Sequence, residues 1–383
     1  MKAKCLNIKG FRSLRMVNWE PGSLNVVIGA NVSGKSNLLR ALLLLQRAAE
    51  GDLPKVILHQ GGIAPLLWDG KVKHLSWKVE TANQGSLTYE LQLQRIGNTS
   101  SYRVQDEALY GRQGRSNSFL ERQPGTAPTG RFQDKNAVIM DRILPDDQTL
   151  LSSVGYGPIG APASEVFSQY LRSWNIYHDL RVDQEAPVRQ ATVARVEKRL
   201  DPDGQNLVPL LYTLYSEDLA FRNALDTGMK AAFGNDFEEL TFPPAADQRV
   251  QLRLRWKSLK SAQSAADLSD GTLRFLMLLS ILANPDPGSL IAIDEPEVGL
   301  HPSMLPVIAE YAAEAAERTQ VIFTTHSPQF LDSFRDVVPT TTVAQWVDGE
   351  TKLSVLDGEE LARWLKEYSL GALFRSGELE GMA

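Results

Sequence analysis

A glycine-rich octapeptide constrains this chain more than any other feature. Residues 29–36 read "GANVSGKS"; the apolar run "SLNVVI" precedes them and the helix-like stretch "NLLRALLLLQRAAE" follows. A buried strand, a glycine turn and a helix N-terminus in this order bring backbone N–H groups together, so that they can hold phosphate oxygens. The sequence therefore predicts a Walker A phosphate-binding loop. A chance Gly-Lys-Ser turn is the alternative, and the flanking strand and helix argue against it.

Two side chains of this loop have distinct predicted roles. Lys35 is expected to bridge the β- and γ-phosphates of ATP, and Ser36 to bind Mg²⁺ through its hydroxyl. ATP and Mg²⁺ are thus the expected cofactors. The predicted nucleotide-binding residues are Gly29, Ala30, Asn31, Val32, Ser33, Gly34, Lys35, Ser36 and Asn37.

Two further apolar runs end in polar residues. "SLIAIDEP", residues 289–296, ends in two carboxylates. Asp294 is the expected Mg²⁺ ligand and Glu295 the general base that polarises water. A pair of solvated acids is the alternative. "VIFTTHSP", residues 321–328, places His326 after a strand, where it could reach a γ-phosphate or hold the attacking water. A lone histidine is more often structural, but the two other motifs favour a catalytic role.

The stretch "LSDGTLRFLMLLSILANP", residues 268–285, reads as a helix with a polar first turn. From Phe275 onward its residues suit a core. Ser269 and the first backbone N–H groups could cap the helix or bind a phosphate. Both interpretations stay open, because a cap and an anion site use the same unpaired donors.

Composition and patterning bound the remainder of the chain. A net charge of −6, a single cysteine and no signal peptide or membrane-spanning run predict a cytoplasmic protein without a membrane segment. Residues 2–8 read as an edge strand, and residues 75–110 as an antiparallel meander. A basic, glycine-rich span could touch DNA phosphates, although a solvated loop is favoured; it comprises Arg112, Arg115, Arg122, Arg131 and Lys135.

The order of these motifs resembles the ABC-type ATPase heads of the SMC, RecF and OLD-like branch, and most of all the stand-alone bacterial RecF-like ATPases. The resemblance covers residues 1–60 and 265–335. It implies an α/β P-loop NTPase fold, a single discontinuous head over residues 1–383. Residues 1–110 and 285–383 would form the nucleotide-binding lobe, with a mostly parallel core sheet and the flanking meander. Residues 111–163 would be a loop-rich insertion, and residues 164–284 a helical lobe.

The resemblance also implies a dimer. "LSDGTLR" is similar to the ABC signature motif, whose residues here are Leu268, Ser269, Asp270 and Gly271. Ser269 and Gly271 would contact the γ-phosphate of the nucleotide bound to a second copy, so that ATP binding makes a homodimer. Residues 297–301 would lie near the dimer seam.

Two weaker assignments follow from the same resemblance. Arg12, within "FRS", would approach the nucleotide phosphates, and an ordinary surface arginine is the alternative. Gln60 is a candidate Mg²⁺-contacting glutamine, but Gln46 is nearly as suitable.

Three biological roles are compatible with these motifs. The first is a RecF-like ATPase of DNA repair or genome maintenance, with DNA as partner. The second is the ATPase of an anti-phage defence or toxin-controlling system that acts with a separate effector protein. The third is a nucleotide-gated scaffold with little turnover.

Overall fold

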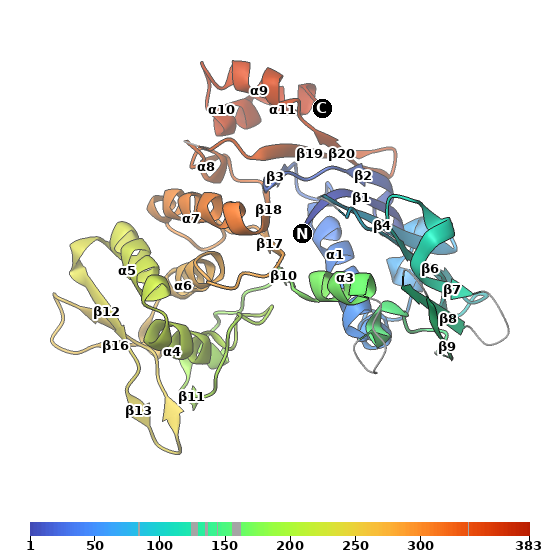
Figure 1. Ribbon diagram of the computed structural model, residues 1–383. Helices are drawn as coiled ribbons and strands as arrows, with labels where there is room; N and C mark the ends of the chain where they lie inside the picture. Colours follow the sequence, from blue (N-terminus) through green and yellow to red (C-terminus); the bar gives the residue numbers. More distant parts are fainter. Residues whose placement is uncertain (83–84, 124–128, 135–136, 144, 155–161, 336) are drawn as a thin grey trace. The chain divides into compact units, whose positions relative to one another are not determined.

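The computed structural model describes residues 1–383 except 83–84, 124–128, 135–136, 144, 155–161 and 336, and the side chains of 123–144 are likewise outside the description. The chain forms two compact units (Figure 1). The first unit comprises Met1–Trp174, Thr340–Gly358 and Glu380–Ala383. The second comprises Asn175–Pro339 and Glu359–Leu379.

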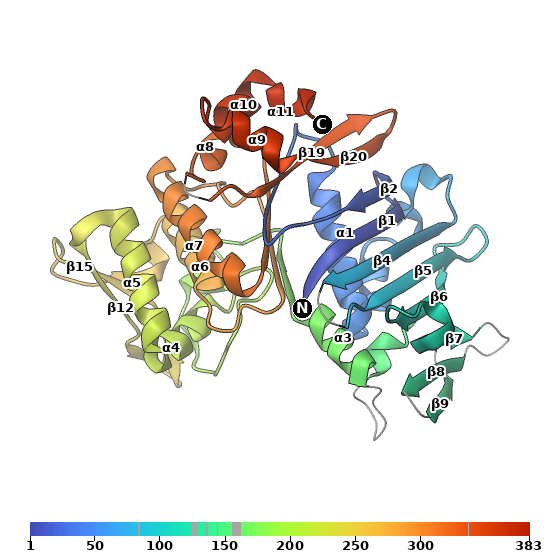
Figure 2. The same cartoon turned by 45° about the horizontal axis from the view of Figure 1, so that its top comes forward.

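An antiparallel sheet dominates the first unit (Figure 2). The predicted meander is present as β4, β5 and β6. In spatial order the strands are β2 (Leu14–Trp19), β1 (Lys2–Phe11), β4 (His74–Ala82), β5 (Thr88–Arg95), β6 (Tyr102–Tyr110), β7 (Ser118–Gln123), β8 (Thr129–Asp134) and β9 (Ala137–Ile143).

Two features of this sheet differ from the prediction. Strand β1 is not an edge strand, because it pairs with β2 on one side and β4 on the other. Its alternating sequence indicates one buried and one solvent-facing side. An interior strand of an antiparallel sheet shows this alternation as well as an edge strand does, so the pattern does not distinguish the two. The segment expected to be loop-rich contains β7, β8 and β9, which continue the sheet from β6. β7 forms its backbone hydrogen bonds with β6, β8 with β7 and β9 with β8, and a Gly- and Pro-rich composition does not reveal these partners.

The remaining elements of the first unit include the strand and the helix on either side of the glycine-rich octapeptide. β3 (Leu24–Ile28) is buried throughout and pairs in parallel with β19 (Thr340–Val347), which pairs antiparallel with β20 (Glu350–Val355). The helices are α1 (Lys35–Glu50), α2 (Leu53–His59) and α3 (Pro162–Arg172). The strand–turn–helix context predicted for the octapeptide is therefore present.

The second unit contains a parallel strand pair covered by helices. β17 (Leu290–Asp294) pairs in parallel with β18 (Gln320–Thr325), and β10 (Trp174–Tyr177) is the other neighbour of β17. The main helices are α4 (Leu207–Glu217), α5 (Leu219–Phe233), α6 (Asp270–Leu282) and α7 (Leu305–Arg318), with short α8 (Pro328–Leu331), α9 (Gly358–Trp364), α10 (Leu370–Ser376) and α11 (Glu378–Gly381). The unit also contains two small three-stranded sheets. The first consists of β11 (Thr192–Val193), β14 (Arg249–Val250) and β13 (Pro244–Ala245). The second consists of β12 (Phe237–Thr241), β15 (Arg253–Trp256) and β16 (Gln263–Ser264).

Helix α6 packs as its sequence predicts. Phe275 and Leu276 are fully buried, and so are the apolar residues that continue to Leu282. Within the described part of the chain, no helix has both the length and the apolar character needed to cross a membrane.

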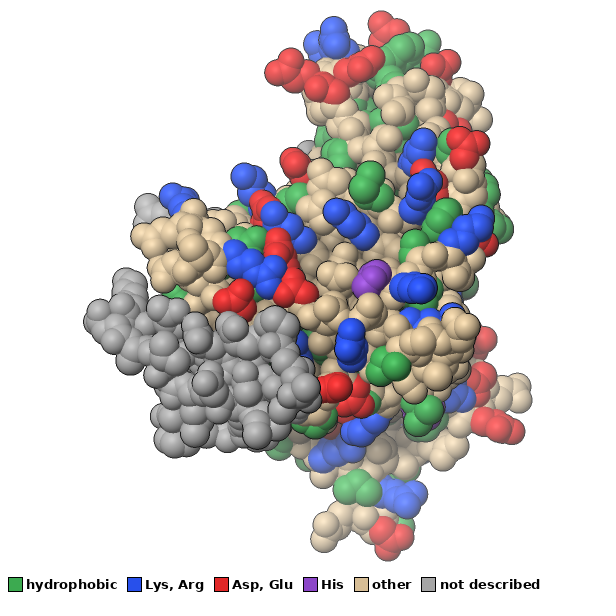
Figure 3. All heavy atoms as spheres, turned by 90° about the vertical axis from the view of Figure 1, so that its right-hand side faces the viewer, with side chains coloured by type: hydrophobic (Ala, Val, Ile, Leu, Met, Phe, Trp, Pro, Cys, Tyr) green, Lys and Arg blue, Asp and Glu red, His purple; other side chains and the backbone are tan. Residues whose placement is uncertain are grey.

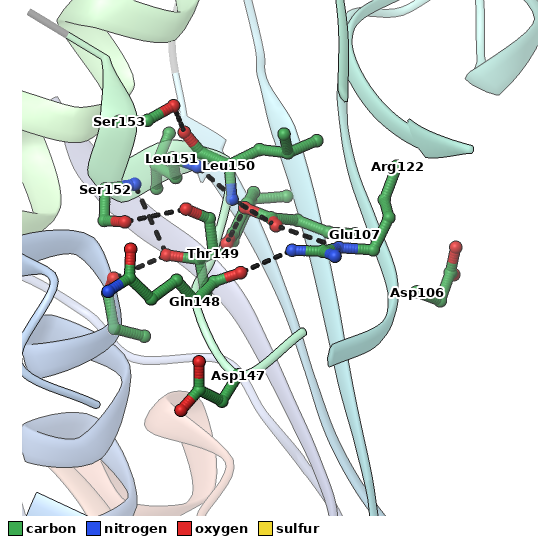
Figure 4. Close-up of polar contacts among 12 residues, drawn as sticks. Asp106, Glu107, Arg122, Asp147, Gln148, Thr149, Leu150, Leu151, Ser152 and Ser153 are labelled. Atoms are coloured by element: carbon green, nitrogen blue, oxygen red, sulfur yellow. Dashed lines mark hydrogen bonds and ion pairs between the residues drawn. The ribbon is translucent and has the colours of Figure 1, made fainter. Parts of the chain in front are cut away.

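A buried carboxylate fastens a loop to the open sheet of the first unit. Glu107, on β6, is fully buried and accepts the N–H groups of Leu150 (2.6 Å) and Leu151 (2.9 Å) and the hydroxyl of Tyr89 (2.8 Å) (Figure 4). The guanidinium of Arg122 lies 3.9 Å away and donates to the carbonyl of Gln148. Burial raises the pKa of Glu107, and Arg122 with the two amides opposes that rise.

Replacing this carboxylate should destabilise the first unit far more than removing one of its donors. In Glu107→Gln, an –NH₂ group would face a backbone N–H, and Arg122 would lose its buried anion. We expect a loss of about 2–4 kcal/mol in the free energy of unfolding, measured by urea denaturation. Tyr89→Phe should cost about 1 kcal/mol. Equal losses in the two variants would contradict the proposed anchoring role.

Candidate nucleotide-binding and catalytic site

The loop between β3 and α1 has the backbone of an anion-binding turn. Gly29, Val32 and Gly34 all have positive φ, at +151°, +73° and +98°. Gly34 is the N-cap of α1 and has no side chain with which to cap it, so the first N–H groups of the helix stay directed toward the loop. Positive-φ residues within a short loop can turn nearby N–H groups to one side, which is the geometry of an anion-binding turn.

Lys35 is the buried cation of this loop. Its side chain is 6% exposed, and Nζ donates to the carbonyls of Gly29 (2.7 Å) and Ala30 (3.0 Å). The ammonium group therefore lies inside the turn. Of the other predicted residues, Ser33 is buried, Asn31 and Val32 are exposed, and Ser36 and Asn37 are half-buried.

Two hydroxyl residues that sequence reasoning missed brace the loop from behind. Thr351 Oγ1, on β20, donates to the carbonyl of Ser33 (2.9 Å) and lies 2.8 Å from Ser13 Oγ. Ser13 Oγ also accepts Asn37 Nδ2 (2.8 Å). A side chain at Gly34 would collide with Thr351 Oγ1 and come within 2.7 Å of Ser13 Oγ. No local pattern marks Thr351, because 315 residues separate it from Ser36 in the chain.

Arg12 and Gln60, two weaker candidates, meet each other. Arg12 Nη2 donates to Gln60 Oε1 at 2.8 Å, and Arg12 has a left-handed φ of +47°. Burial and then the nearby charge of Arg40 lower the pKa of Arg12. Two guanidinium groups in proximity favour an anion, which keeps Arg12 a candidate for phosphate contact. Gln46, the alternative to Gln60, is buried and donates to the carbonyl of Trp174 (2.7 Å).

The second unit brings together the predicted acids and histidine. Parallel strands β17 and β18 end side by side, with Asp294 opposite Thr324. Glu295, the next residue, meets His326 Nδ1 with its Oε1 at 2.8 Å, and its N–H donates to the Thr324 carbonyl. Glu295 has a φ of +47°, a conformation that costs on the order of 1 kcal/mol in a non-glycine residue and is found preferentially at functional sites.

A second carboxylate stands behind this pair. Glu297 Oε1 accepts the hydroxyl of Thr325 (2.6 Å), and Thr325 Oγ1 in turn accepts the N–H of Ser327 (3.0 Å). These bonds hold the backbone on both sides of His326. Burial raises the pKa of Glu297.

His178 is a site residue that the sequence analysis missed. It follows β10, and its Nδ1 lies 2.5 Å from Asp294 Oδ2, while the Thr324 hydroxyl donates to Asp294 Oδ1. The Asp294 side chain is 6% exposed, so its carboxylate is oriented from both sides. The available signal was the position of His178 directly after a short apolar strand, the position that His326 also occupies.

The turn before α6 is a helix cap in this structure. Ser269 Oγ accepts the N–H of Thr272 (3.1 Å), which confirms the predicted cap. A Cβ at Gly271 would lie 2.6 Å from the carbonyl of Gly299, so glycine permits close packing against residues 297–301. The phosphate-binding role of this turn stays a prediction.

The oxygen donors suit Mg²⁺ bound with a nucleotide. Mg²⁺ usually takes one or two protein oxygens and completes its shell with phosphates and water. The Ser36 hydroxyl and the Asp294 carboxylate are oxygens of this kind. Among the residues that the structure describes, there is no group of three or more His, Cys, Asp or Glu side chains that could hold a metal ion.

Comparison with known families decides the affiliation. Residues 24–136 and 142–332 match the family described as "AAA domain, putative AbiEii toxin, Type IV TA system". The chain belongs to this family. It is an ATPase head of the SMC/RecF-like branch with the P-loop NTPase fold that the motif order implied.

Relatives of this AAA-family head support the same placement. A 141-residue stretch is 28% identical to the DNA repair protein RecN of Synechocystis sp. (strain ATCC 27184 / PCC 6803 / Kazusa), and it covers 37% of this chain. The match spans only 22% of the length of RecN.

Solved structures resemble the AAA-family head in fold. An SMC head bound to the C-terminal winged-helix domain of ScpA aligns with a TM-score of 0.60 at 12% identity, covering 94% of this chain and 100% of the SMC chain. A Pyrococcus furiosus SMC head with an extended coiled coil, bound to the C-terminal domain of ScpA, gives 0.58 at 13% identity, with 96% and 99% covered.

The brace behind the P-loop should contribute to nucleotide affinity. In Thr351→Ala, the Ser33 carbonyl loses its hydrogen-bond donor, and the turn loses the hydroxyl that packs against Gly34. We expect ATP affinity to fall by about three- to tenfold, corresponding to one hydrogen bond. Titration with a fluorescent ATP analogue measures the change. Ser354→Ala, three residues further along β20, is the control and should bind normally. Unaltered affinity in Thr351→Ala would argue against the brace.

Proposed function

We propose that this protein binds and hydrolyses ATP with Mg²⁺, and that ATP binding joins two copies head to head. The observation that carries the proposal is the Glu295–His326 pair at the ends of two parallel strands, in a chain with a complete P-loop. Hydrolysis by P-loop enzymes needs a general base for the attacking water and a carboxylate for Mg²⁺. Glu295, held beside His326, suits the first role, and Asp294 suits the second.

Each residue has a proposed task. The N–H groups of residues 29–36 and Lys35 hold the β- and γ-phosphates, so that the γ-phosphoryl group is fixed for in-line attack. Mg²⁺ held by Ser36 and Asp294 would neutralise phosphate charge. Glu295 accepts the proton of the attacking water, and His326 keeps the carboxylate oriented. The products are ADP and phosphate.

The signature turn supplies the reason for a dimer. Ser269 and the first N–H groups of α6 form a second N-terminal anion site, and the motif order assigns it to the nucleotide of another copy. One chain would therefore hold ATP through its own P-loop and hydrolyse it poorly alone.

Variants at different residues should affect ATP binding, dimerisation and ATP hydrolysis separately. Glu295→Gln should bind ATP, lose about 100-fold or more of its turnover for want of a general base, and accumulate as a dimer. Lys35→Ala should lose ATP binding and the dimer together. Light scattering and phosphate release measure these properties, and Glu310→Gln, an exposed acid on α7, is the control. A Glu295→Gln protein that binds ATP yet stays monomeric would count against the dimer.

The biological role that we favour is DNA repair or genome maintenance. The RecN match supports it, since that relative is a DNA repair protein. The basic span does not carry the proposal: Arg122 is buried beside Glu107, and Arg115 pairs with Asp106, Glu90 and Glu121. The side chains of Arg131 and Lys135 lie outside the described residues. Positive and negative side chains are interspersed on the face that Figure 3 shows.

A DNA-linked ATPase should respond to DNA in a salt-dependent manner. Duplex or single-stranded DNA is expected to raise the rate of ATP hydrolysis. The apparent DNA affinity should fall linearly on a logarithmic plot against salt, because phosphate contacts release counterions. Phosphate release at several salt concentrations measures both. An ATPase rate that no DNA alters would remove the support for this role.

The family description favours a second candidate, an ATPase that controls a toxic effector. In that case DNA would leave turnover unaltered, and Lys35→Ala would release the toxicity of a co-expressed partner. Growth of cells that express the variant with its neighbouring genes separates the two roles.

A further inference from the structure

An acidic residue stands where the proposed dimer must bind phosphate. Asp270 is the first residue of α6, in the turn between Ser269 and Gly271, and its side chain is 66% exposed. An acid here is favourable for the helix dipole but repels a phosphate that approaches the same N–H groups. An unrestrained Asp270 would therefore compete with the ligand proposed for this turn.

Arg189 engages that carboxylate. Arg189 ends a short 3₁₀ turn, Pro187–Arg189, and its side chain is only 7% exposed. Its Nη2 contacts Asp270 Oδ1 directly. The negative charge of Asp270 is thus paired with a buried guanidinium of the same unit.

The same guanidinium holds the backbone that leads into the turn. Nη1 donates to the carbonyl of Leu268 (2.6 Å) and lies 3.3 Å from those of Ala265 and Ala266. Nε donates to the carbonyls of Val182 (2.9 Å) and Asp183 (3.1 Å). A planar guanidinium is suited to this, because its donors point in fixed directions. Arg189 therefore fastens residues 265–270 to residues 182–183.

We propose that Arg189 is the positioning residue of the signature turn. It draws the Asp270 carboxylate aside and neutralises it, so that Ser269 and the N–H groups of α6 can receive the phosphate of a nucleotide held by a second copy of this chain. This inference rests on the proposed ATP-dependent dimer and names a residue on which that dimer depends. Arg189 would act on association and leave the P-loop of its own chain unaffected.

A charge-removal cycle tests the proposal. In a Glu295→Gln background that traps the dimer, Arg189→Gln leaves Asp270 unpaired in front of the phosphate, and the dimer dissociation constant should rise by about tenfold or more. Asp270→Asn should dimerise at least as well as the parent. The double variant Arg189→Gln/Asp270→Asn should recover most of the loss, because the repelling charge has gone. Analytical ultracentrifugation with ATP measures dimerisation.

Two measurements separate positioning from folding. Monomer affinity for a fluorescent ATP analogue should be equal in all variants, and thermal denaturation reports their stability. Arg199, which pairs with Asp286 in the same unit, is the matched control: Arg199→Gln should leave dimerisation unchanged. If Arg189→Gln unfolds, the cycle is run with Arg189→Met, which removes the charge but keeps a long apolar side chain in the buried position.

The outcomes discriminate clearly. Rescue by Asp270→Asn supports the proposal. Normal dimerisation of Arg189→Gln overturns it, as does a double variant that remains as weak as Arg189→Gln, since Arg189 would then serve only the fold. Failure of the parent Glu295→Gln protein to dimerise with ATP overturns the proposed dimer itself and this inference with it, and it is recognised before any Arg189 variant is made.

Discussion

The first unit depends on backbone N–H groups that converge at the end of a buried strand. The positive φ of Gly34 has no steric cost, because glycine lacks a Cβ, whereas the positive φ of Val32 costs energy that the surrounding structure must offset. Thr351 donates to the Ser33 carbonyl, and the hydroxyls of Thr351 and Ser13 occupy the space that a side chain at Gly34 would need. The turn that we propose to bind phosphate is thus supported by β20 and by the loop after β1, as well as by its own glycines.

The second unit uses the ends of adjacent strands in the same way. Parallel strands present their carboxyl ends at one edge, and residues that follow them become neighbours. Asp294 is the last residue of β17 and Glu295 follows it, while His326 and His178 directly follow β18 and β10, and two histidine–carboxylate pairs result. His178 orients Asp294, the proposed Mg²⁺ ligand, and His326 orients Glu295, the proposed base. Each of the two adjacent carboxylates therefore has its own histidine partner.

Polar groups in the rest of the chain mainly secure loops. Glu107 accepts the N–H groups of Leu150 and Leu151, and Arg189 donates to the carbonyl of Leu268 before α6. Each is a buried charge with several directed bonds, an arrangement that specifies one loop conformation. In the first case the result is a stable sheet, and in the second we infer a signature turn prepared for a second copy.

The sequence by itself determined the motifs whose partners are local. Gly29 to Ser36 and the cap of Ser269 each form within a few residues, so their spacing predicts both geometry and chemistry. The apolar runs before Asp294 and His326 likewise predicted two strand ends. The tertiary structure decided which distant groups complete them: Thr351 behind the P-loop, His178 beside Asp294 and Arg189 beside Asp270. Their contacts cross long stretches of chain, and chain closure over such lengths leaves no periodic pattern that residues in sequence could reveal.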